Sequence, residues 1–192
     1  MTKNTLLDIT VIISRILKVI VVIGAIALTG LLIYIEIDQN AFKGVEIKIA
    51  NSSNSAFGYH ITGSETYRGA EANESPFTID KIKTLTKYVF YLKSIGILFL
   101  IFVAFNSFEK IMLSVKSLKT FSSGNDKLFK RIGFCILGIL VLQSYTVMRY
   151  NYGMQMKISV NFVYIIYALI AFVMAQIFKE AHKLQEENDL TI

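Results

Sequence analysis

The sequence predicts an all-α membrane protein, with four transmembrane helices in a bundle and a small extracytoplasmic loop domain containing short β-strands. Four long apolar stretches share a single charge, Lys93. Each is long enough for a bilayer core of ~30 Å, which needs roughly 20 helical residues. Charged residues make up only 18% of the 192-residue chain, and a chain this short can hardly bury four apolar helices without lipid. The stretches are Val19–Ile35, Tyr88–Phe108, Ile132–Met148 and Ile158–Phe178.

The predicted segments alternate between membrane and water. The first is an amphipathic lead-in with Asp8, Arg15 and Lys18 on one face, a pattern that suits the membrane–water interface. The span that follows has a face of small residues, among them Gly24 and Gly30, which lets a neighbouring helix approach closely. The predicted segments are the lead-in 1–18, span 19–36, loop domain 37–87, span 88–108, basic loop 109–131, span 132–148, external hairpin 149–157, span 158–178 and tail 179–192.

The loop domain contains two candidate strands. Val45–Ile49 alternates apolar and charged residues, as a half-buried strand does. Ala56–Gly63 is rich in aromatic residues and is predicted to be a second strand, with the turn Asn51–Ser55 between the two. Gly63–Glu74 reads as loop. We therefore expect a small cap of mixed structure outside the membrane.

Basic residues beside the spans predict the orientation. The short loop 109–131 carries six of them: Lys110, Lys116, Lys119, Lys127, Lys130 and Arg131. Placing this loop and both termini on one side collects more Lys and Arg there than on the opposite side. The expected localisation is therefore the bacterial cytoplasmic (inner) membrane, multi-pass, with both termini in the cytoplasm. The same dispersed positive charge, +6 overall, suits anionic lipid headgroups and indicates no direct nucleic-acid binding.

Chemistry-bearing residues are sparse within the predicted spans. These spans contain no Asp, Glu or His, whereas membrane enzymes and ion-coupled carriers usually place such groups in the bilayer. Gln143 and Asn161 lie toward the same membrane face on adjacent predicted spans, and each amide can hydrogen-bond across a helix interface. His60 and His182 have no metal-ligand spacing, and Cys135 reads as a small buried apolar residue. We expect no catalytic constellation, no metal and no cofactor.

Two segments on the expected cytoplasmic side carry more signal. In the basic loop, Lys127, Lys130 and Arg131 are predicted to anchor the chain to anionic lipid or to the tail. The tail 179–192 is predicted to continue the fourth helix, with basic residues first and acidic residues at its tip. That acidic tip can pair with the basic loop or present a docking surface to a soluble protein. The predicted docking residues are Leu184, Glu186, Glu187 and Leu190.

The same two segments resemble a known family. The loop segment Phe121-Ser122, Asn125 and Leu128–Gly133 is similar to the loop signature of the YoaS-like four-span bacterial membrane proteins of unknown function. The ending Ile177–Ile192 resembles the C-terminus of that family, which closes with phenylalanine, leucine, glutamates and Asn-x-Leu-Thr. Ala181 departs from it, because the family often has glycine there. The resemblance implies no activity, but members are often encoded beside a small helix-turn-helix regulator, which implies a cytoplasmic DNA-binding partner.

The predicted function is a non-enzymatic membrane regulator or sensor that acts with such a partner. In this hypothesis the loop domain responds to an envelope or small-molecule cue, and the basic loop and acidic tail hold or release the soluble protein. The alternative is a small transport or envelope-protection protein, in the form of a homo-oligomer with a pore between protomers. An enzyme is the third and least favoured class.

Overall fold

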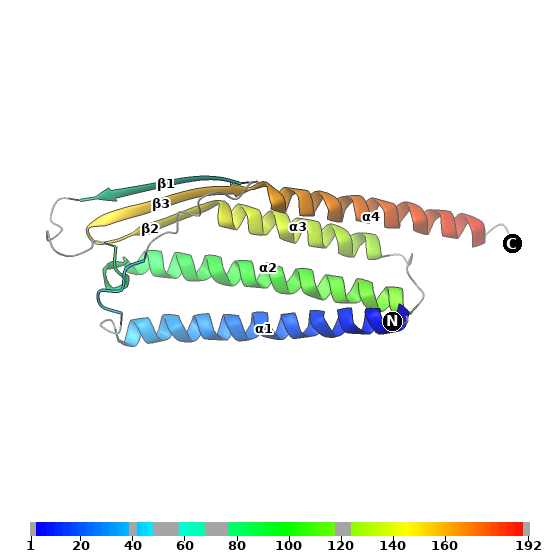
Figure 1. Cartoon of the computed structure of the whole chain (residues 1–192), viewed down its shortest axis with the longest axis horizontal. Coiled ribbons are helices and arrows are strands. Elements are labelled where there is room, and N and C mark those ends of the chain that lie inside the picture. Colours follow the sequence, from blue (N-terminus) through cyan, green and yellow to red (C-terminus); the bar gives the residue numbers. More distant parts are fainter. Residues whose placement is uncertain (1–2, 39–41, 48–57, 68–76, 118–123, 190–192) are drawn as a thin grey trace. The chain divides into compact units, whose positions relative to one another are not determined.

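The computed structural model describes residues 3–38, 42–47, 58–67, 77–117 and 124–189. These residues form four α-helices, one three-stranded sheet and a short 3₁₀ helix (Figure 1). The elements are α1 (Lys3–Ile37), β1 (Gly58–Thr66), η1 (Ile79–Lys81), α2 (Thr84–Lys116), α3 (Asn125–Ser144), β2 (Tyr145–Arg149), β3 (Gly153–Asn161) and α4 (Phe162–Asp189).

The chain divides into two compact units, and all four helices have residues in both, although only the first two residues of α4 belong to unit 2. Unit 1 contains both ends of the sequence and the connection from α2 to α3; its segments are Met1–Ile23, Leu98–Ile139 and Tyr164–Ile192. Unit 2 contains the predicted loop domain and the sheet; its segments are Gly24–Ile97 and Leu140–Val163. The charges in the first half of α1 and the second half of α2 therefore belong to unit 1, and the β-structure belongs to unit 2.

Three helices are long and apolar enough to cross a membrane, over Thr5–Ile37, Thr84–Lys116 and Phe162–Asn188. These helices make the chain a multi-pass membrane protein by length and composition. The helix α3 does not meet the same criterion within the described residues. It begins with the polar and charged run Asn125–Arg131, so its apolar part is about 20 Å long at 1.5 Å per residue, short of the ~30 Å bilayer core.

The predicted boundaries of the third and fourth spans are wrong where the chain forms strands. Tyr145–Met148 belongs to β2, and Ile158–Asn161 belongs to β3, so α4 begins only at Phe162. Both stretches contain β-branched residues, and the first also contains a tyrosine; these residue types favour strands. Both stretches adjoin apolar helices, and hydropathy alone does not mark where such a helix ends and a strand begins. The side chain of Asn161 ends the strand, because its Oδ1 accepts a hydrogen bond of 3.0 Å from the backbone N–H of Val163.

The first and second spans are parts of longer helices than predicted. The lead-in and the first span form one continuous helix, α1. The predicted loop 109–131 is largely helical, since α2 continues to Lys116 and α3 begins at Asn125. Gly124, whose φ is +122°, stands just before α3 in a conformation that glycine adopts most readily. The tail continues α4 to Asp189 as predicted.

The sheet joins parts of the chain that are far apart in sequence. Its order is β1-β3-β2 with antiparallel neighbours, so that Gly58 pairs with Asn161 and Thr66 with Gly153 (Figure 1). The strand expected near Ala56–Gly63 is therefore confirmed from Gly58, and it extends to Thr66 into the predicted loop. Its partner is β3 rather than Val45–Ile49, of which the described part contributes one isolated bridge, Glu46 with Thr78. The predicted turn 51–55 lies outside the described residues.

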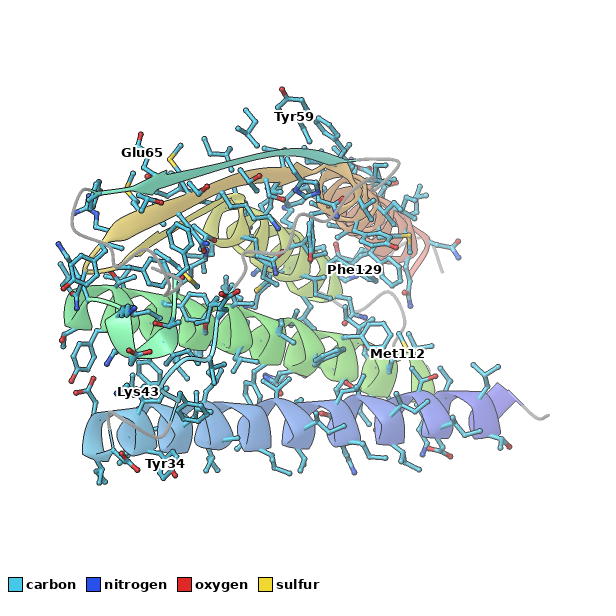
Figure 2. All side chains as sticks on the ribbon, turned by 60° about the vertical axis from the view of Figure 1, so that its left-hand side comes forward. Tyr34, Lys43, Tyr59, Glu65, Met112 and Phe129 are labelled. Atoms are coloured by element: carbon cyan, nitrogen blue, oxygen red, sulfur yellow. The ribbon has the colours of Figure 1, made fainter. Side chains whose placement is uncertain are left out.

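Tyr150 occupies the core beneath the sheet in unit 2. It is fully buried, and its ring meets the ring of Phe77 edge-on at a centroid distance of 5.3 Å. Burial raises the pKa of the Tyr150 phenol, so the hydroxyl stays protonated and donates to Gln155 Oε1 at 3.3 Å. The backbone N–H of Tyr150 donates to the Gly153 carbonyl at 2.8 Å, which closes the β2–β3 turn. By contrast, Tyr59 and Glu65 on β1 are exposed and point away from the sheet (Figure 2).

Glycines in α1 and α3 meet different surroundings. A Cβ added at Gly133 of α3 would lie 2.7 Å from Cε1 of Phe172 on α4, closer than real Cβ contacts. A Cβ added at Gly24 or Gly30 of α1 would meet nothing within 4 Å. At these two glycines, the neighbour expected for the small-residue face of the first span is therefore not another described part of this chain.

We expect Gly133→Ala to lower the free energy of unfolding by about 1–3 kcal/mol, because the methyl group must displace the Phe172 ring. Gly24→Ala is the matched control, and it is expected to be neutral or to stabilise by up to about 1 kcal/mol through helix propensity. Thermal unfolding followed by circular dichroism in one detergent compares the two variants. Equal melting temperatures would contradict the packing of α3 on α4 described here.

Candidate functional site

A charged cluster joins α1 to α2 within unit 1. The carboxylate of Glu109 on α2 accepts a hydrogen bond from Arg15 Nε at 2.7 Å and one from Lys18 Nζ, both on α1. The same Lys18 ammonium donates to Asn106 Oδ1 at 3.4 Å. We call Arg15, Lys18, Asn106 and Glu109 the charged cluster. In this cluster, two cations surround one carboxylate. Arg15 and Lys18 are three residues apart on α1, and Asn106 and Glu109 are one turn apart on α2.

Much of the charged cluster is shielded from solvent. The Glu109 side chain is 9% exposed and that of Lys18 is 19% exposed, whereas Arg15 is 61% exposed. Beside the cluster, the buried hydroxyl of Ser14 donates to the Phe105 carbonyl at 3.1 Å and brings the two backbones close. A charge taken out of water is tolerated when it is paired and hydrogen-bonded, and here each partner meets that condition. The cluster therefore holds α1 against α2 at the level of Glu109.

The tail extends α4 as an exposed amphipathic helix. Leu184 is 66% exposed, and Glu186 and Glu187 are exposed too. Within the tail, His182 Nε2 contacts Glu186 at 3.3 Å, and Lys183 forms an ion pair with Glu187 at 3.7 Å. Leu190, the fourth predicted docking residue, lies outside the described residues. Three of the predicted docking residues are thus accessible on one helix.

The predicted anchor residues lie on α3 rather than in a loop. Lys127, Lys130 and Arg131 are all exposed in its first two turns, and their spacing places them on one helix face. The ring of Phe129, on the same turn, packs against Phe178 of α4 with centroids 4.9 Å apart (Figure 2). The start of α3 is therefore fixed to the point on α4 where the charged tail begins.

Comparison with known proteins supplies the family. The sequence profile described as "Protein of unknown function (DUF2975)" matches residues 71–192. The chain belongs to the DUF2975 family. The resemblance to YoaS-like membrane proteins is thereby confirmed, and the family description carries no function. No curated protein and no solved structure matches the chain.

The DUF2975 match divides the charged cluster. Glu109 and Asn106 lie within the matched range 71–192, together with α2, α3, β2, β3 and α4. Arg15 and Lys18 on α1 precede that range, as does β1. The cluster and the sheet thus each tie the family-typical part of the chain to its N-terminal part.

The predicted intramembrane polar residues have local roles in this DUF2975 protein. The amide of Asn161 caps α4, as described above. Gln143 stands one residue before the last residue of α3 and is exposed. Lys93, the single charge within the four predicted spans, donates to the Tyr145 carbonyl at 2.8 Å and to Thr146 Oγ1 at 2.6 Å. Its ammonium therefore ties α2 to the start of β2.

Sequence reasoning missed the charged cluster, although a signal for it exists. Glu109 is the only acidic residue between Asp80 and Asp126, and it comes just after the long apolar run of α2. A lone carboxylate in such a setting needs a cation, and Arg15 and Lys18 are the nearest pair on the preceding helix. Among the residues that the structure describes, no group of three His, Cys, Asp or Glu side chains is placed to hold a metal ion.

Proposed function

We propose that this DUF2975 protein is a non-enzymatic regulator or sensor of the bacterial cytoplasmic membrane that holds a cytoplasmic DNA-binding protein on its tail. One observation carries the proposal. The helix α4 is unbroken over its 28 residues, about 42 Å at 1.5 Å per residue, while the bilayer core is ~30 Å thick. The excess leaves the tail as a rigid extension of a membrane helix, so a movement of α4 is transmitted to whatever the tail holds.

The composition of the tail suits a basic partner. The exposed Leu184 supplies an apolar anchor, and Glu186 and Glu187 supply negative charge beside it. Exposed ion pairs four residues apart on a helix contribute only about 0.3–0.5 kcal/mol each. A partner that offers Lys or Arg therefore replaces His182 and Lys183 at little cost, and a DNA-binding protein is rich in such residues.

The placement of the sequence ends supports the orientation in this proposal. Both ends of the sequence and the α2–α3 connection belong to unit 1, as does the exposed cationic face of α3. Cytoplasmic segments of membrane proteins carry an excess of Lys and Arg near the spans. Unit 1 therefore faces the cytoplasm, and Lys127, Lys130 and Arg131 contact anionic headgroups beside the tail.

Site-specific photo-crosslinking in native membranes tests the docking surface. A photoreactive amino acid at Glu187 is compared with one at Gln185, which is also exposed but lies about 200° around the helix. We expect a DNA-binding protein to be captured from position 187, with a several-fold weaker yield from position 185. Leu184→Asp is expected to abolish the capture, because a charge replaces the apolar anchor.

Two results would count against the regulator. Equal yields from positions 187 and 185 would mean that the tail has no specific docking face. Crosslinks only to membrane proteins, or to a second copy of this chain, would favour the transport or envelope-protection alternative. In that case the face of Gly24 and Gly30, which meets no described part of this chain, becomes the first place to seek the contact between copies.

A further inference from the structure

Unit 2 contains an apolar cavity of about 240 Å³ between the second half of α1, the first half of α2 and the loop domain. Its walls are aliphatic and aromatic side chains from all three parts, and Met148 of β2 completes them. The loop domain closes one side with three isoleucines, and α1 and α2 form the others. Representative lining residues are Leu32, Ile47, Ile79, Ile82 and Phe90.

The character of the cavity excludes water as its natural occupant. Almost all of its wall is carbon, and an ordered water needs two to four polar partners. The cavity is also partly open, and the two helices that line it are both long and apolar enough to cross a membrane. An apolar space between two such helices is occupied by hydrocarbon, because leaving its walls uncovered forfeits their dispersion contacts.

A loosely held cation stands among the lining residues. Lys87 lines the cavity, its side chain is 13% exposed, and its Nζ lies 3.9 Å from Glu36 Oε1. That distance is an ion pair without a hydrogen bond, and Glu36 Oε1 is buried with no hydrogen-bond partner among the described residues. An anion that reached Lys87 would gain the charge-assisted hydrogen bond that Glu36 does not make.

We propose that this cavity binds one acyl chain with an anionic headgroup, the chain lying among the isoleucines and the headgroup against Lys87. The volume lies below the 300–1,000 Å³ of pockets for drug-sized ligands, so part of a single chain fits and a bulky ring system does not. A fatty acid carboxylate and a phospholipid phosphate share this chemistry. The idea that this ligand is the cue of the sensor rests on the proposed function. The idea that the cavity binds the ligand does not depend on that function.

The absence of tryptophan from the sequence makes a direct binding assay available. Phe90→Trp places the only indole in the cavity wall, and Leu92→Trp is the control. Leu92 is 71% exposed and lies two residues, about 200°, further round α2, so it reports bulk lipid at nearly the same depth. Each variant, purified and reconstituted in non-brominated bilayers, is titrated with dibrominated stearic acid, which quenches indole fluorescence on contact.

We expect the Phe90→Trp signal to saturate at a low mole fraction of brominated acid, while the Leu92→Trp signal follows the bulk fraction. Adding Lys87→Gln to the Phe90→Trp variant should weaken binding of the acid about tenfold, the loss expected for one charge-assisted hydrogen bond. Dibrominated stearyl alcohol, which has no charge, should bind the parent and the Lys87→Gln variant alike. Ile82→Phe, which fills the cavity, should remove the saturable component for both probes.

The measurements distinguish a phospholipid from a free fatty acid, and they distinguish failure of this proposal from failure of the proposed function. Tighter saturation by brominated phosphatidylglycerol than by brominated stearic acid assigns the site to a phospholipid, and the reverse order assigns it to a free fatty acid. Identical, non-saturating curves for Phe90→Trp and Leu92→Trp overturn the proposal, as does an acid affinity that Lys87→Gln leaves unchanged. Because this assay contains no partner protein and leaves the tail intact, its failure does not affect the crosslinking from Glu187, and a failed crosslink does not affect the quenching.

Discussion

Tyr150→Ala is expected to destabilise the loop domain and sheet by about 3–5 kcal/mol, the cost of truncating a large, fully buried aromatic side chain. The change removes the edge-on contact with Phe77 and leaves a cavity beneath the sheet. It also removes the hydroxyl that donates to Gln155, whose side chain is itself buried. Hydrogen exchange of the β1 and β3 amides, compared before and after the substitution, measures the loss where it is expected.

The control for this prediction lies two residues away. Tyr152 is 41% exposed in the same turn, so Tyr152→Ala should change stability by no more than about 0.5 kcal/mol. Tyr150→Phe keeps the ring and loses only the hydroxyl, with an expected cost of about 1 kcal/mol. Comparable exchange rates in the Tyr150→Ala and Tyr152→Ala variants would mean that the core of unit 2 is not centred on Tyr150.

Glu109→Ala is expected to lower the free energy of unfolding by roughly 3 kcal/mol, because it leaves the ammonium of Lys18 largely buried without its carboxylate. The estimate stands at the low end for a broken buried pair, since Arg15 is 61% exposed and is rehydrated when its partner is lost. Denaturant or thermal unfolding in detergent measures it. Asp8→Ala is the control: it breaks the half-exposed pair of Asp8 with Lys116 between the same two helices, and it should cost less than about 1 kcal/mol.

A double substitution separates the pair from its parts. Lys18→Met with Glu109→Leu removes both charges and keeps the side-chain volume, and replacing a buried ion pair in this way is often neutral. The double variant should therefore recover most of the stability lost in Glu109→Ala. If it is as unstable as the single variant, the loss comes from packing around α2 rather than from an unpaired Lys18.

The long apolar helices and the tail were predictable because their signals are local. A run such as Tyr88–Phe108 can be recognised from its own hydropathy, and the structure places the whole run within α2. The strands β2 and β3 escaped prediction because Tyr145–Met148 and Ile158–Asn161 are apolar runs that adjoin apolar helices. The partner of β1 was not predictable from the residues near it, since pairing with β3 depends on register between distant segments.

The candidate sites were predictable to different degrees. A polar helix that continues beyond a span is expected to be exposed. The structure shows that exposure at Leu184, Glu186 and Glu187. The charged cluster was hidden because Arg15 and Lys18 suit an interfacial helix equally well, and only the approach of α1 to α2 reveals Glu109 as their partner. The cavity depends on which side chains fail to fill a space, and no pattern along a single element encodes that.

The pairing of β1 with β3 also sets an order of events during biosynthesis. Because Gly58–Thr66 is made well before Gly153–Asn161, β1 leaves the ribosome with no strand to pair with, and it waits for seconds while α2 and α3 are synthesised. An unpaired strand is a template for pairing with other chains. The polar, glycine-containing sequence of β1 lessens that hazard. One edge of β1 is paired when β3 has been made, at the point where synthesis reaches α4, and the other edge has no partner strand in the sheet.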